Sequence, residues 1–305
     1  MERKIWNRLA SGQGIEKLGL DTIDGRIDLR NLNVPERQLE RVVKSSIGVF
    51  RKFGGITKIE GASWEKLDFS SSDLSHLVLT DCEISDCVFN RCSMRGIIAK
   101  ATSFIDSRFH SADLRDSLLG GFRENRRNVF RNVEFIKCDL RATFYKEAEF
   151  NGCHFRNCKL DRVEFSSSTF EDCSFEGELK EVIFYRRTWD KGNFPENRMA
   201  RVDFGKARLR WCAFRGLDMT DATFPNDDEH IVIRNFPSIL DELISYYKDK
   251  SDLGSKGATS VLGNYRKWAG GPDSIGVLNK VDILEIGGDE LVQSVMEIIG
   301  NSALR

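Results

Sequence analysis

Eight cysteines give this chain of 305 residues its largest set of side chains that could bind a metal ion or form disulfide bonds. Zinc sites typically place two cysteines at a C-x₂-C spacing, which no pair here has. Most neighbouring cysteines are instead separated by five residues or a multiple of five. We therefore expect structural thiols in a reducing compartment, with no metal site. The cysteines are Cys82, Cys87, Cys92, Cys138, Cys153, Cys158, Cys173 and Cys212.

Histidines and carboxylates could perform acid–base chemistry, but their spacing does not favour it. The four histidines, His76, His110, His154 and His230, are scattered, and no phosphate-binding glycine motif occurs. A glycosidase would need two acids facing one groove, whereas the pair Glu171-Asp172 is expected on a solvated turn. The sequence therefore predicts a protein that is not an enzyme, with no catalytic residue, no cofactor-binding residue and no cofactor.

Five arginines lie in two irregular stretches of the sequence. Arg123, Arg126 and Arg127 fall within residues 120–128, and Arg186 and Arg187 within residues 185–198. Guanidinium groups bind carboxylates and phosphates, so these side chains are candidate contacts for a partner molecule. Solvated surface charge is the alternative interpretation, and the sequence leaves both open. Direct nucleic-acid binding is a further alternative, which the many balancing acids disfavour.

A large apolar residue recurs every five residues between Trp64 and Phe224. This period fits neither a strand nor a helix, so the chain must turn a corner at each unit. A one-residue insertion near residues 120–128 and a one-residue deletion after Phe175 interrupt the pattern. The recurring residues include Phe69, Leu74, Leu79, Ile84, Phe89, Met94, Ala99, Phe104, Phe109, Leu114, Leu119, Phe130, Phe135, Leu140, Tyr145, Phe150, Phe155, Leu160, Phe165, Phe170 and Phe175.

A small residue lies two positions before each large one, and all eight cysteines occupy this position. We expect both positions to point inward and the other three to be mostly polar. Cysteine would then replace alanine as a compact apolar side chain. Cys138 with Cys158, and Cys153 with Cys173, should lie on one wall, close enough for a bridge by distance alone.

Every fourth unit carries a similar type of large residue, which predicts four walls and about twenty residues per coil. One predicted wall contains Phe89, Phe109, Phe130 and Phe150. A second wall contains Phe184, Phe204 and Phe224. Across residues 185–198 we expect a distorted coil rather than a long excursion, with Trp189, Phe194 and Met199 in register and Arg187 at an opened wall, because burying an unpaired charge is costly.

The pattern resembles the pentapeptide-repeat family, whose motif Ala-(Asp/Asn)-Leu-x-x is matched by Ala112-Asp113-Leu114, Cys138-Asp139-Leu140 and Ser72-Asp73-Leu74. The resemblance implies a mainly β fold, a right-handed quadrilateral β-helix solenoid of about eight coils. Some members of that family mimic DNA and modulate type II topoisomerases such as gyrase. That role implies a strongly acidic surface, whereas this chain has a net charge of −1.

The predicted domains are an N-terminal α/β cap region at residues 1–60, the β-helix at 61–226 and a mostly helical C-terminal segment at 227–305. In the first, we expect a short helix and then a Gly-rich turn from Met1 to about Leu20, a strand or stray repeat at Ile27–Leu29 and a helix at 35–43. In the last, we expect helices from Pro237, over Val261–Trp268 and over Asp289–Ile299, with a loop at Ser251–Lys256. This segment is expected to act as a cap, an oligomer contact or a small domain.

These features favour a non-enzymatic protein-interaction or scaffold module built on rigid coils. The expected partner is a protein, with a homodimer contact through the C-terminal helices as one option and gyrase modulation by DNA mimicry as the alternative. No apolar run reaches the roughly 18 residues that a transmembrane helix needs. Without a signal-peptide pattern at the start, the expected location is cytoplasmic.

Overall fold

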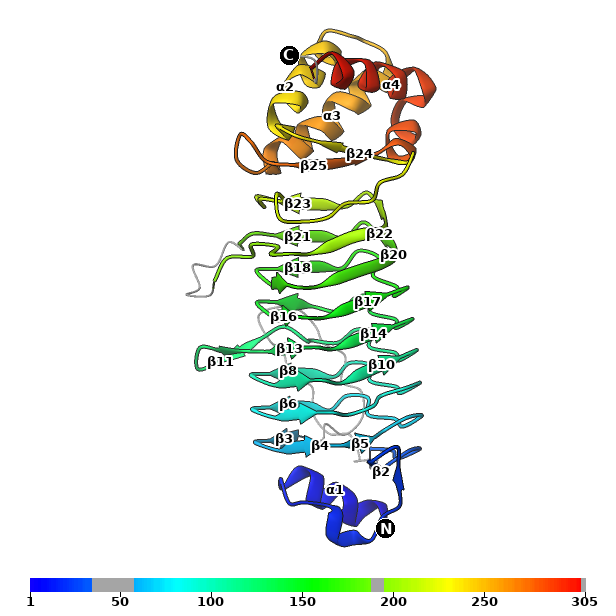
Figure 1. Ribbon diagram of the computed structural model, residues 1–305, viewed down its shortest axis with the longest axis vertical. Coiled ribbons are helices and arrows are strands. Elements are labelled where there is room, and N and C mark those ends of the chain that lie inside the picture. The colour runs from blue at the N-terminus through cyan, green and yellow to red at the C-terminus, as the bar shows by residue number, and fades with distance from the viewer. Residues whose placement is uncertain (35–57, 188–194, 303–305) are drawn as a thin grey trace, which may run out of the picture. The chain divides into compact units, whose positions relative to one another are not determined.

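The computed structural model describes residues 1–34, 58–187 and 195–302 of the chain (Figure 1). The chain divides into two compact units, Met1–Lys159 and Leu160–Arg305. The predicted boundaries near residues 60 and 226 stay predictions. The predicted helix at 35–43 and the positions of Trp189 and Phe194 lie outside the described residues.

The first unit is built mainly from very short strands. Its elements are α1 (Glu2–Ala10), the 3₁₀ helix η1 (Glu16–Leu18), β1 (Thr22–Ile23), β2 (Arg26–Asp28), β3 (Lys58–Glu60), β4 (Ser63–Glu65), β5 (Leu67–Asp68), β6 (Val78–Thr80), β7 (Glu83–Ser85), β8 (Ile98–Lys100), β9 (Ser103–Ile105), β10 (Arg108–His110), β11 (Phe122–Arg123), β12 (Arg126–Arg127), β13 (Val129–Arg131), β14 (Glu134–Ile136), β15 (Tyr145–Lys146), β16 (Glu149–Asn151) and β17 (His154–Arg156).

Four parallel ladders run through the first unit, one for each wall of a four-sided coil. One joins β3, β6 and β8, a second joins β4, β7, β9, β13 and β16, and a third contains β10, β14 and β17. The fourth is a series of bridges running from Asn33 through Asp73 and Asp113 to Lys159. The predicted quadrilateral β-helix is therefore confirmed, while the number of coils stays a prediction.

The corners and the interior follow the five-residue period. One residue per corner has a left-handed backbone, for example Asp81 with φ 55° and Asp86 with φ 49°, and Asp tolerates this conformation better than most residues. Inside, the rings of Phe69, Phe89 and Phe109 stack with centroid spacings of 5.5 and 4.7 Å. All eight cysteines are buried free thiols, as expected for the small position.

The small position also has a hydrogen-bonding role that the sequence analysis missed. The thiol of Cys153 donates to the carbonyl of Phe130 at 3.3 Å, and the thiol of Cys158 donates to the carbonyl of Phe135 at 3.2 Å. The hydroxyl of Ser117 makes the same kind of bond to the carbonyl of Met94 at 3.1 Å. The small residue therefore ties each coil to the one before it, which alanine cannot do.

The predicted wall assignment across residues 120–128 is wrong. Phe130 pairs with Phe104 and stacks on it at 5.1 Å, and Phe135 pairs with Phe109 and stacks on it at 5.0 Å. These partners are 26 residues apart instead of the usual twenty, so six residues are inserted rather than one. The insertion forms the antiparallel hairpin of β11 and β12, and every later residue of this unit moves by one wall.

Asn128 closes the base of this hairpin from the small position. Its side chain is buried, and its Oδ1 accepts a hydrogen bond from the backbone N–H of Thr102 at 2.9 Å. Its Nδ2 donates to the carbonyls of Ala99 and Leu119, both at 2.8 Å. One amide thus satisfies three backbone groups that the departing chain would leave buried without partners.

The N-terminal elements pack against the start of the coils. Helix α1 buries Ile5, Trp6 and Leu9, and its Leu9 carbonyl accepts a hydrogen bond from the indole N–H of Trp64 at 3.2 Å. The predicted strand or stray repeat near Ile27 is the parallel strand β2, which pairs with β5. These contacts fit the expected cap, because they cover the unpaired end of a stack of coils.

The second unit continues with short and long strands and then helices. Its elements are β18 (Glu164–Ser166), β19 (Thr169–Glu171), β20 (Ser174–Lys180), β21 (Ile183–Tyr185), β22 (Asp203–Arg210), β23 (Ala213–Arg215), β24 (His230–Ile233), α2 (Phe236–Lys248), α3 (Leu253–Trp268), β25 (Gly276–Asn279) and α4 (Lys280–Ser302).

The predicted distorted coil at residues 185–198 is wrong as well. Phe184 pairs with Phe214, thirty residues later, and not with Phe204. Phe204 stacks on Phe175 at 5.1 Å. The segment between Phe184 and Met199 therefore contains ten more residues than a coil needs, although the predicted one-residue deletion before Phe184 is confirmed by the pairing of Phe165 with Phe184.

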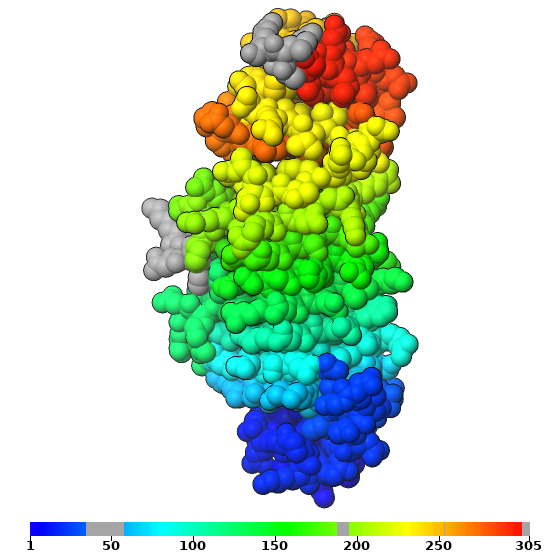
Figure 2. Space-filling view, viewed as in Figure 1, coloured from blue at the N-terminus to red at the C-terminus, as the bar shows by residue number. Residues whose placement is uncertain are grey.

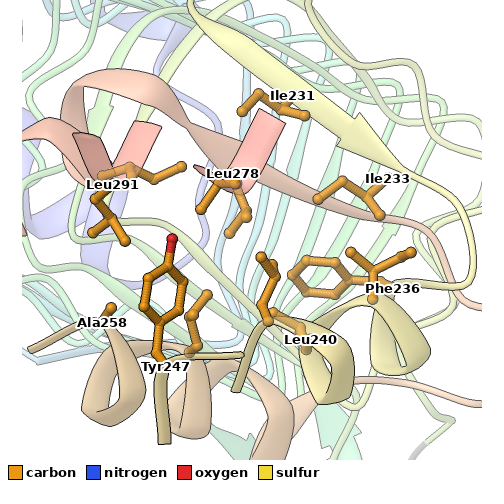
Figure 3. Close-up of a cluster of buried hydrophobic side chains, with 13 residues drawn as sticks. Ile231, Ile233, Phe236, Leu240, Tyr247, Ala258, Leu278 and Leu291 are labelled. Atoms are coloured by element: carbon orange, nitrogen blue, oxygen red, sulfur yellow. The ribbon is translucent and has the colours of Figure 1, made fainter. Parts of the chain in front are cut away.

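The C-terminal segment is mostly helical, as predicted, and its helices share one apolar core. Strands β24 and β25 pair antiparallel, and Figure 3 shows Ile231, Phe236, Leu240 and Leu278 within one buried cluster. In Figure 2 the atoms of α2, α3 and α4, coloured yellow to red, form a closely packed group.

Two details of the C-terminal helices differ from the sequence prediction. The predicted loop at Ser251–Lys256 is wrong, because Asp252 accepts a hydrogen bond from the N–H of Ser255 at 2.8 Å and starts α3 at Leu253. Helix α4 begins before Asp289 and is kinked at Gly287 and Gly288, where Gly288 has φ 69°.

Candidate functional site

The hairpin of residues 121–127, hereafter the hairpin, extends from the coils of the first unit (Figure 1). Its two central residues, Glu124 and Asn125, both have positive φ, at 51° and 63°. This geometry fits the tight two-residue turns that match the twist of paired strands. At its base the N–H of Asn128 donates to the carbonyl of Gly121 at 3.2 Å. The hairpin is therefore an ordered projection.

The three arginines of the hairpin bind carboxylates of the same chain. Arg123 contacts Glu60 at 2.5 Å and Asp81 at 2.9 Å, and Arg126 contacts Asp81 at 2.5 Å. Arg127 contacts Glu149 at 2.8 Å. The structure thus brings these three predicted site residues together. Their ion pairs hold the hairpin against the coils of the same chain.

The exposed residues of the hairpin are Phe122, Glu124, Asn125 and Arg126. Phe122 is 48% exposed, and the side chains of Arg126 and Glu124 are 60% and 75% exposed. A half-exposed aromatic ring next to charges is a common composition at protein interfaces. Nothing in the five-residue pattern identified Phe122, because it lies within the insertion.

The other two predicted arginines lie in the second unit, beside the ten-residue insertion. Arg186 pairs with Glu196 at 2.5 Å, and Arg187 pairs with the same carboxylate. The Arg187 side chain is 71% exposed, so this position is open to solvent, as expected for a charge at a small position. Arg186 chiefly, together with Arg187, holds the pKa of Glu196 below its usual value, although partial desolvation opposes this.

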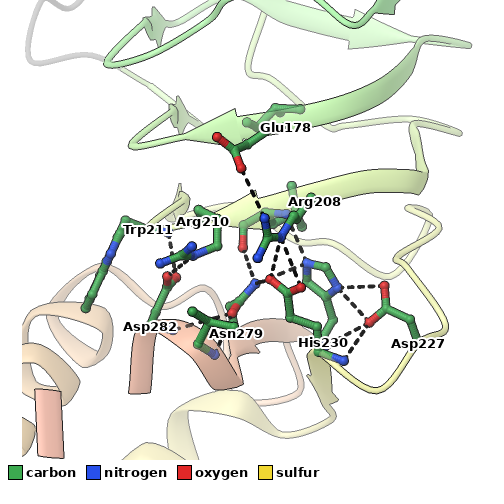
Figure 4. Close-up of polar contacts among 12 residues, drawn as sticks. Glu178, Arg208, Arg210, Trp211, Asp227, His230, Asn279 and Asp282 are labelled. Atoms are coloured by element: carbon green, nitrogen blue, oxygen red, sulfur yellow. Dashed lines mark hydrogen bonds and ion pairs between the residues drawn. The ribbon is translucent and has the colours of Figure 1, made fainter. Parts of the chain in front are cut away.

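A polar cluster in the second unit covers the backbone edge of β22 (Figure 4). The ring Nε2 of His230 accepts a hydrogen bond from the N–H of Leu209 at 2.9 Å, so its Nδ1–H donates to Asp227 at 2.9 Å. The Nδ2 of Asn279 donates to the Leu209 carbonyl at 2.8 Å. Sequence analysis missed this Asp–His pair, whose spacing of three residues carries little information without the fold.

Asp282 extends the same cluster along β22. It accepts hydrogen bonds from the N–H of Trp211 at 2.6 Å and from Arg210 at 2.5 Å. Burial raises the pKa of the Asp282 carboxyl, against the lowering effect of Arg210. For Asp227, partial desolvation acts to raise the pKa, but hydrogen bonds from His230 hold it below its usual value. An Asp–His pair often indicates catalysis, yet here both histidine nitrogens are engaged in closing a β-helix edge.

A cavity of about 710 Å³ lies within the second unit. One side is formed by residues of β21 and β23, including Ile183, Ala213 and Arg215, and the other by α3 and β25, including Tyr265 and Trp268. The Arg215 guanidinium lies 5.0 Å from the ring centre of Tyr185 and 4.9 Å from that of Trp268. This concave, aromatic-lined space was not predicted, because it depends on how the helices cover the coils.

The described residues contain no group of three or more His, Cys, Asp or Glu side chains placed to hold a metal ion. Within the same ranges, no helix is both long and apolar enough to cross a membrane. The cysteine thiols face the coil interior, and burial raises the pKa of Cys87 and of Cys212 to about 12. Such thiols are poor nucleophiles at neutral pH.

Two segments of the chain match known repeat families. Residues 82–121 match the family described as pentapeptide repeats, with eight copies, and residues 129–204 match the family described as a pentapeptide repeat region. The gap between the two matches contains most of the hairpin, in agreement with its being an insertion. Among curated proteins, none matches the sequence.

Solved pentapeptide-repeat structures are similar at low identity. HetL from the cyanobacterium Nostoc sp. strain PCC 7120, a protein involved in heterocyst differentiation regulation, is 13% identical over 69% of this chain and 94% of HetL, with a TM-score of 0.36. Rfr23 from the cyanobacterium Cyanothece 51142 is 11% identical over 42% of this chain and 90% of its own, with a TM-score of 0.31. QnrB1, a plasmid-mediated fluoroquinolone resistance protein, is 19% identical over 56% and 91%, with a TM-score of 0.29. Scores this low carry no argument about function.

Proposed function

We propose that this chain is a non-enzymatic protein-interaction module, as the match of residues 82–121 and 129–204 to pentapeptide-repeat models supports. In this proposal the coils are a rigid support, and the hairpin of the first unit contacts a protein partner. The single observation that carries the proposal is an ordered hairpin, ion-paired to its own wall, which the four-sided coil does not need.

Preorganisation is the physical reason to assign the contact to the hairpin. A loop that is already fixed loses little conformational entropy when a partner binds. Asp81 forms ion pairs with both Arg123 and Arg126, and the hydrogen bonds of Asn128 hold the base of the hairpin. The exposed ring of Phe122 therefore lies on a pair of strands whose position is already fixed.

Removal of residues 121–126 gives a sharp test. This deletion joins Gly120 to Arg127 and leaves Asn128 two positions before Phe130, so one regular five-residue unit replaces the insertion. Tagged wild-type protein and the deletion variant would be used to recover partners, and each recovered protein would be purified and its affinity measured. We expect at least one partner whose affinity falls about tenfold or more on deletion.

A matched variant, Arg162→Met, removes an exposed arginine outside the hairpin and should leave that affinity unchanged. Phe122→Ser and Arg126→Glu should each weaken binding, since both side chains are exposed on the hairpin. Recovery of identical partners with identical affinities by the wild type and the deletion variant would contradict the proposal.

The nucleic-acid alternative receives no support from the arginines. Arg123, Arg126, Arg127, Arg186 and Arg187 all pair with carboxylates of this chain, which compete with phosphate for the same guanidinium groups. A homodimer contact through the C-terminal helices stays a proposal, motivated by the exposed Leu284 and Met296 of α4, at 43% and 39%. Light scattering at several protein concentrations tests it, since a mass that stays monomeric throughout would rule out a stable dimer.

A further inference from the structure

We propose that the cavity of about 710 Å³ in the second unit binds a small molecule with a planar apolar body and a carboxylate group. The proposal concerns a different place from the hairpin and does not depend on the function proposed above. Cavities of this size that combine aromatic walls with a few polar groups are typical of small-molecule sites.

Arg215 supplies the anion-binding group. Its Nη1 donates to the hydroxyl of Tyr185 at 2.8 Å, and among the described residues no carboxylate lies within ion-pair distance of it. Its Nε is buried and has no hydrogen-bond partner. Arginine presents a planar fork that suits carboxylate oxygens, so a bound carboxylate would satisfy donors that the protein leaves unused.

The other charged groups of the cavity lining are already engaged. Arg162 pairs with Glu181 at 2.7 Å, and Glu164 accepts a hydrogen bond from the Tyr185 hydroxyl at 3.2 Å. Arg215 is therefore the guanidinium in the lining that lacks a carboxylate. The Tyr185 hydroxyl lies between Arg215 and Glu164, so the feature of this lining that favours an anion is the Arg215 Nε, which has no hydrogen-bond partner.

The lining on both sides of Arg215 suits a flat apolar body. Trp268 and Tyr265 come from α3, and Ile183 and Ala213 come from the facing strands. The guanidinium lies over the Trp268 ring, 4.9 Å from its centre, so its charge is held against an aromatic face.

Two matched probes test the proposal by calorimetry on the full chain: naphthalene-2-carboxylate and its neutral analogue naphthalene-2-carboxamide. We expect the carboxylate to bind about tenfold or more tightly than the carboxamide at neutral pH. Arg215→Met should bring the two affinities together, because it keeps the side-chain length and removes the charge. Arg266→Met is the matched control, since Arg266 lies on α3 between the lining residues Tyr265 and Trp268 but outside the lining itself, and pairs with Asp241. It should leave the preference intact.

Ala213→Leu provides an independent variant that fills the space without removing charge, and it should weaken both probes. Equal affinities of the two probes for the wild-type protein would overturn the proposal, as would a wild-type preference that persists in Arg215→Met. Absence of carboxylate binding at about millimolar concentration would overturn it as well. If Arg215→Met does not fold, the probe pair with the wild type and with Ala213→Leu still decides the matter.

Discussion

The Oδ1 of Asn128 accepts a hydrogen bond from the backbone N–H of Thr102, which lies 26 residues earlier and on the adjacent coil. In neighbouring coils a hydroxyl makes the equivalent bond, for example Ser107 Oγ with the N–H of Cys87 at 3.1 Å. Asn128 is the residue at which the chain returns from the hairpin. In the second unit Asn197 has the same position two residues before Met199, and its Oδ1 accepts from the N–H of Phe170 at 3.3 Å. A buried asparagine thus marks the return from each insertion.

Asn128→Ala should destabilise the protein by about 2–4 kcal/mol, because the N–H of Thr102 and the carbonyls of Ala99 and Leu119 all lose a buried partner. Urea unfolding followed by circular dichroism measures the change. Ser63→Ala, on the exposed face of β4, serves as the control and should change stability by less than about 0.5 kcal/mol. If the urea midpoint of Asn128→Ala equals that of the control, the Asn128 side chain does not stabilise the place where the chain rejoins the coil after the hairpin.

Deletion of residues 121–126 should leave the coils folded. The loss consists mainly of exposed ion pairs, each contributing about 0–1 kcal/mol, so we expect a total change below about 2 kcal/mol. Deletion of residues 121–125 is the matched comparison, since it leaves one extra residue at a corner and should be clearly more destabilising. If the shorter deletion is tolerated better than the longer one, the six-residue insertion is not the correct description.

A large apolar residue at every fifth position predicted the four-sided coil. The same pattern could not give the number of residues in an insertion. A five-residue period fixes position only up to a multiple of five. A six-residue insertion before Phe130 therefore looks like one residue, and a ten-residue insertion before Met199 leaves the five-residue register unchanged. The pairing of Phe130 with Phe104 resolves the first, and the pairing of Phe214 with Phe184 resolves the second.

Candidate site residues were predictable only in part, for a related reason. Arg187 stood out because its charge fell at a position that should be small and apolar, and Arg123 because it lies in an irregular stretch with three arginines. Their carboxylate partners, such as Asp81 and Glu196, come from other corners and cannot be found without the register. Contacts such as His230 with Leu209 depend on the helices that follow the coils, where no repeat constrains the pairing.

Stability should fall with rising pH above about 9 because of the buried thiols. Burial raises the pKa of Cys87 from 9.0 to about 12 in the folded chain. Below pH 9 the thiol is neutral in both states and its full contribution is present; above pH 9 the unfolded chain ionises first, so the free energy of unfolding declines until about pH 12. The decline is about 1.4 kcal/mol per pH unit for each such thiol. Urea midpoints between pH 8 and 11 measure it. Cys87→Ala should reduce the pH dependence of the free energy of unfolding by the contribution of one thiol, and an unchanged pH dependence would contradict this account.

His230→Ala should loosen the C-terminal segment more than the coils. The substitution leaves the N–H of Leu209 buried without an acceptor and removes the hydrogen bond to Asp227, which together cost about 1–3 kcal/mol. Limited proteolysis should then cut residues 227–302 earlier than in the wild-type protein. His110→Ala, on an exposed face of β10, is the control and should leave the cleavage order unchanged. Equal cleavage rates for both variants and the wild type would mean that the histidine does not close the edge of β22.

Gyrase supercoiling should be unaffected by this protein at micromolar concentration. DNA mimicry requires a continuous acidic surface, since the partner's phosphate-binding residues must be matched along its length. Here acids and bases alternate along the walls as ion pairs, for example Arg108 with Glu134 at 2.5 Å and Arg115 with Asp113 at 2.6 Å, and the net charge is −1. A supercoiling assay with increasing protein, run with and without a fluoroquinolone, measures the effect directly. Dose-dependent inhibition, or protection against the drug, that is lost in Glu134→Lys would establish the DNA-mimic alternative in place of the hairpin-centred interaction proposed here.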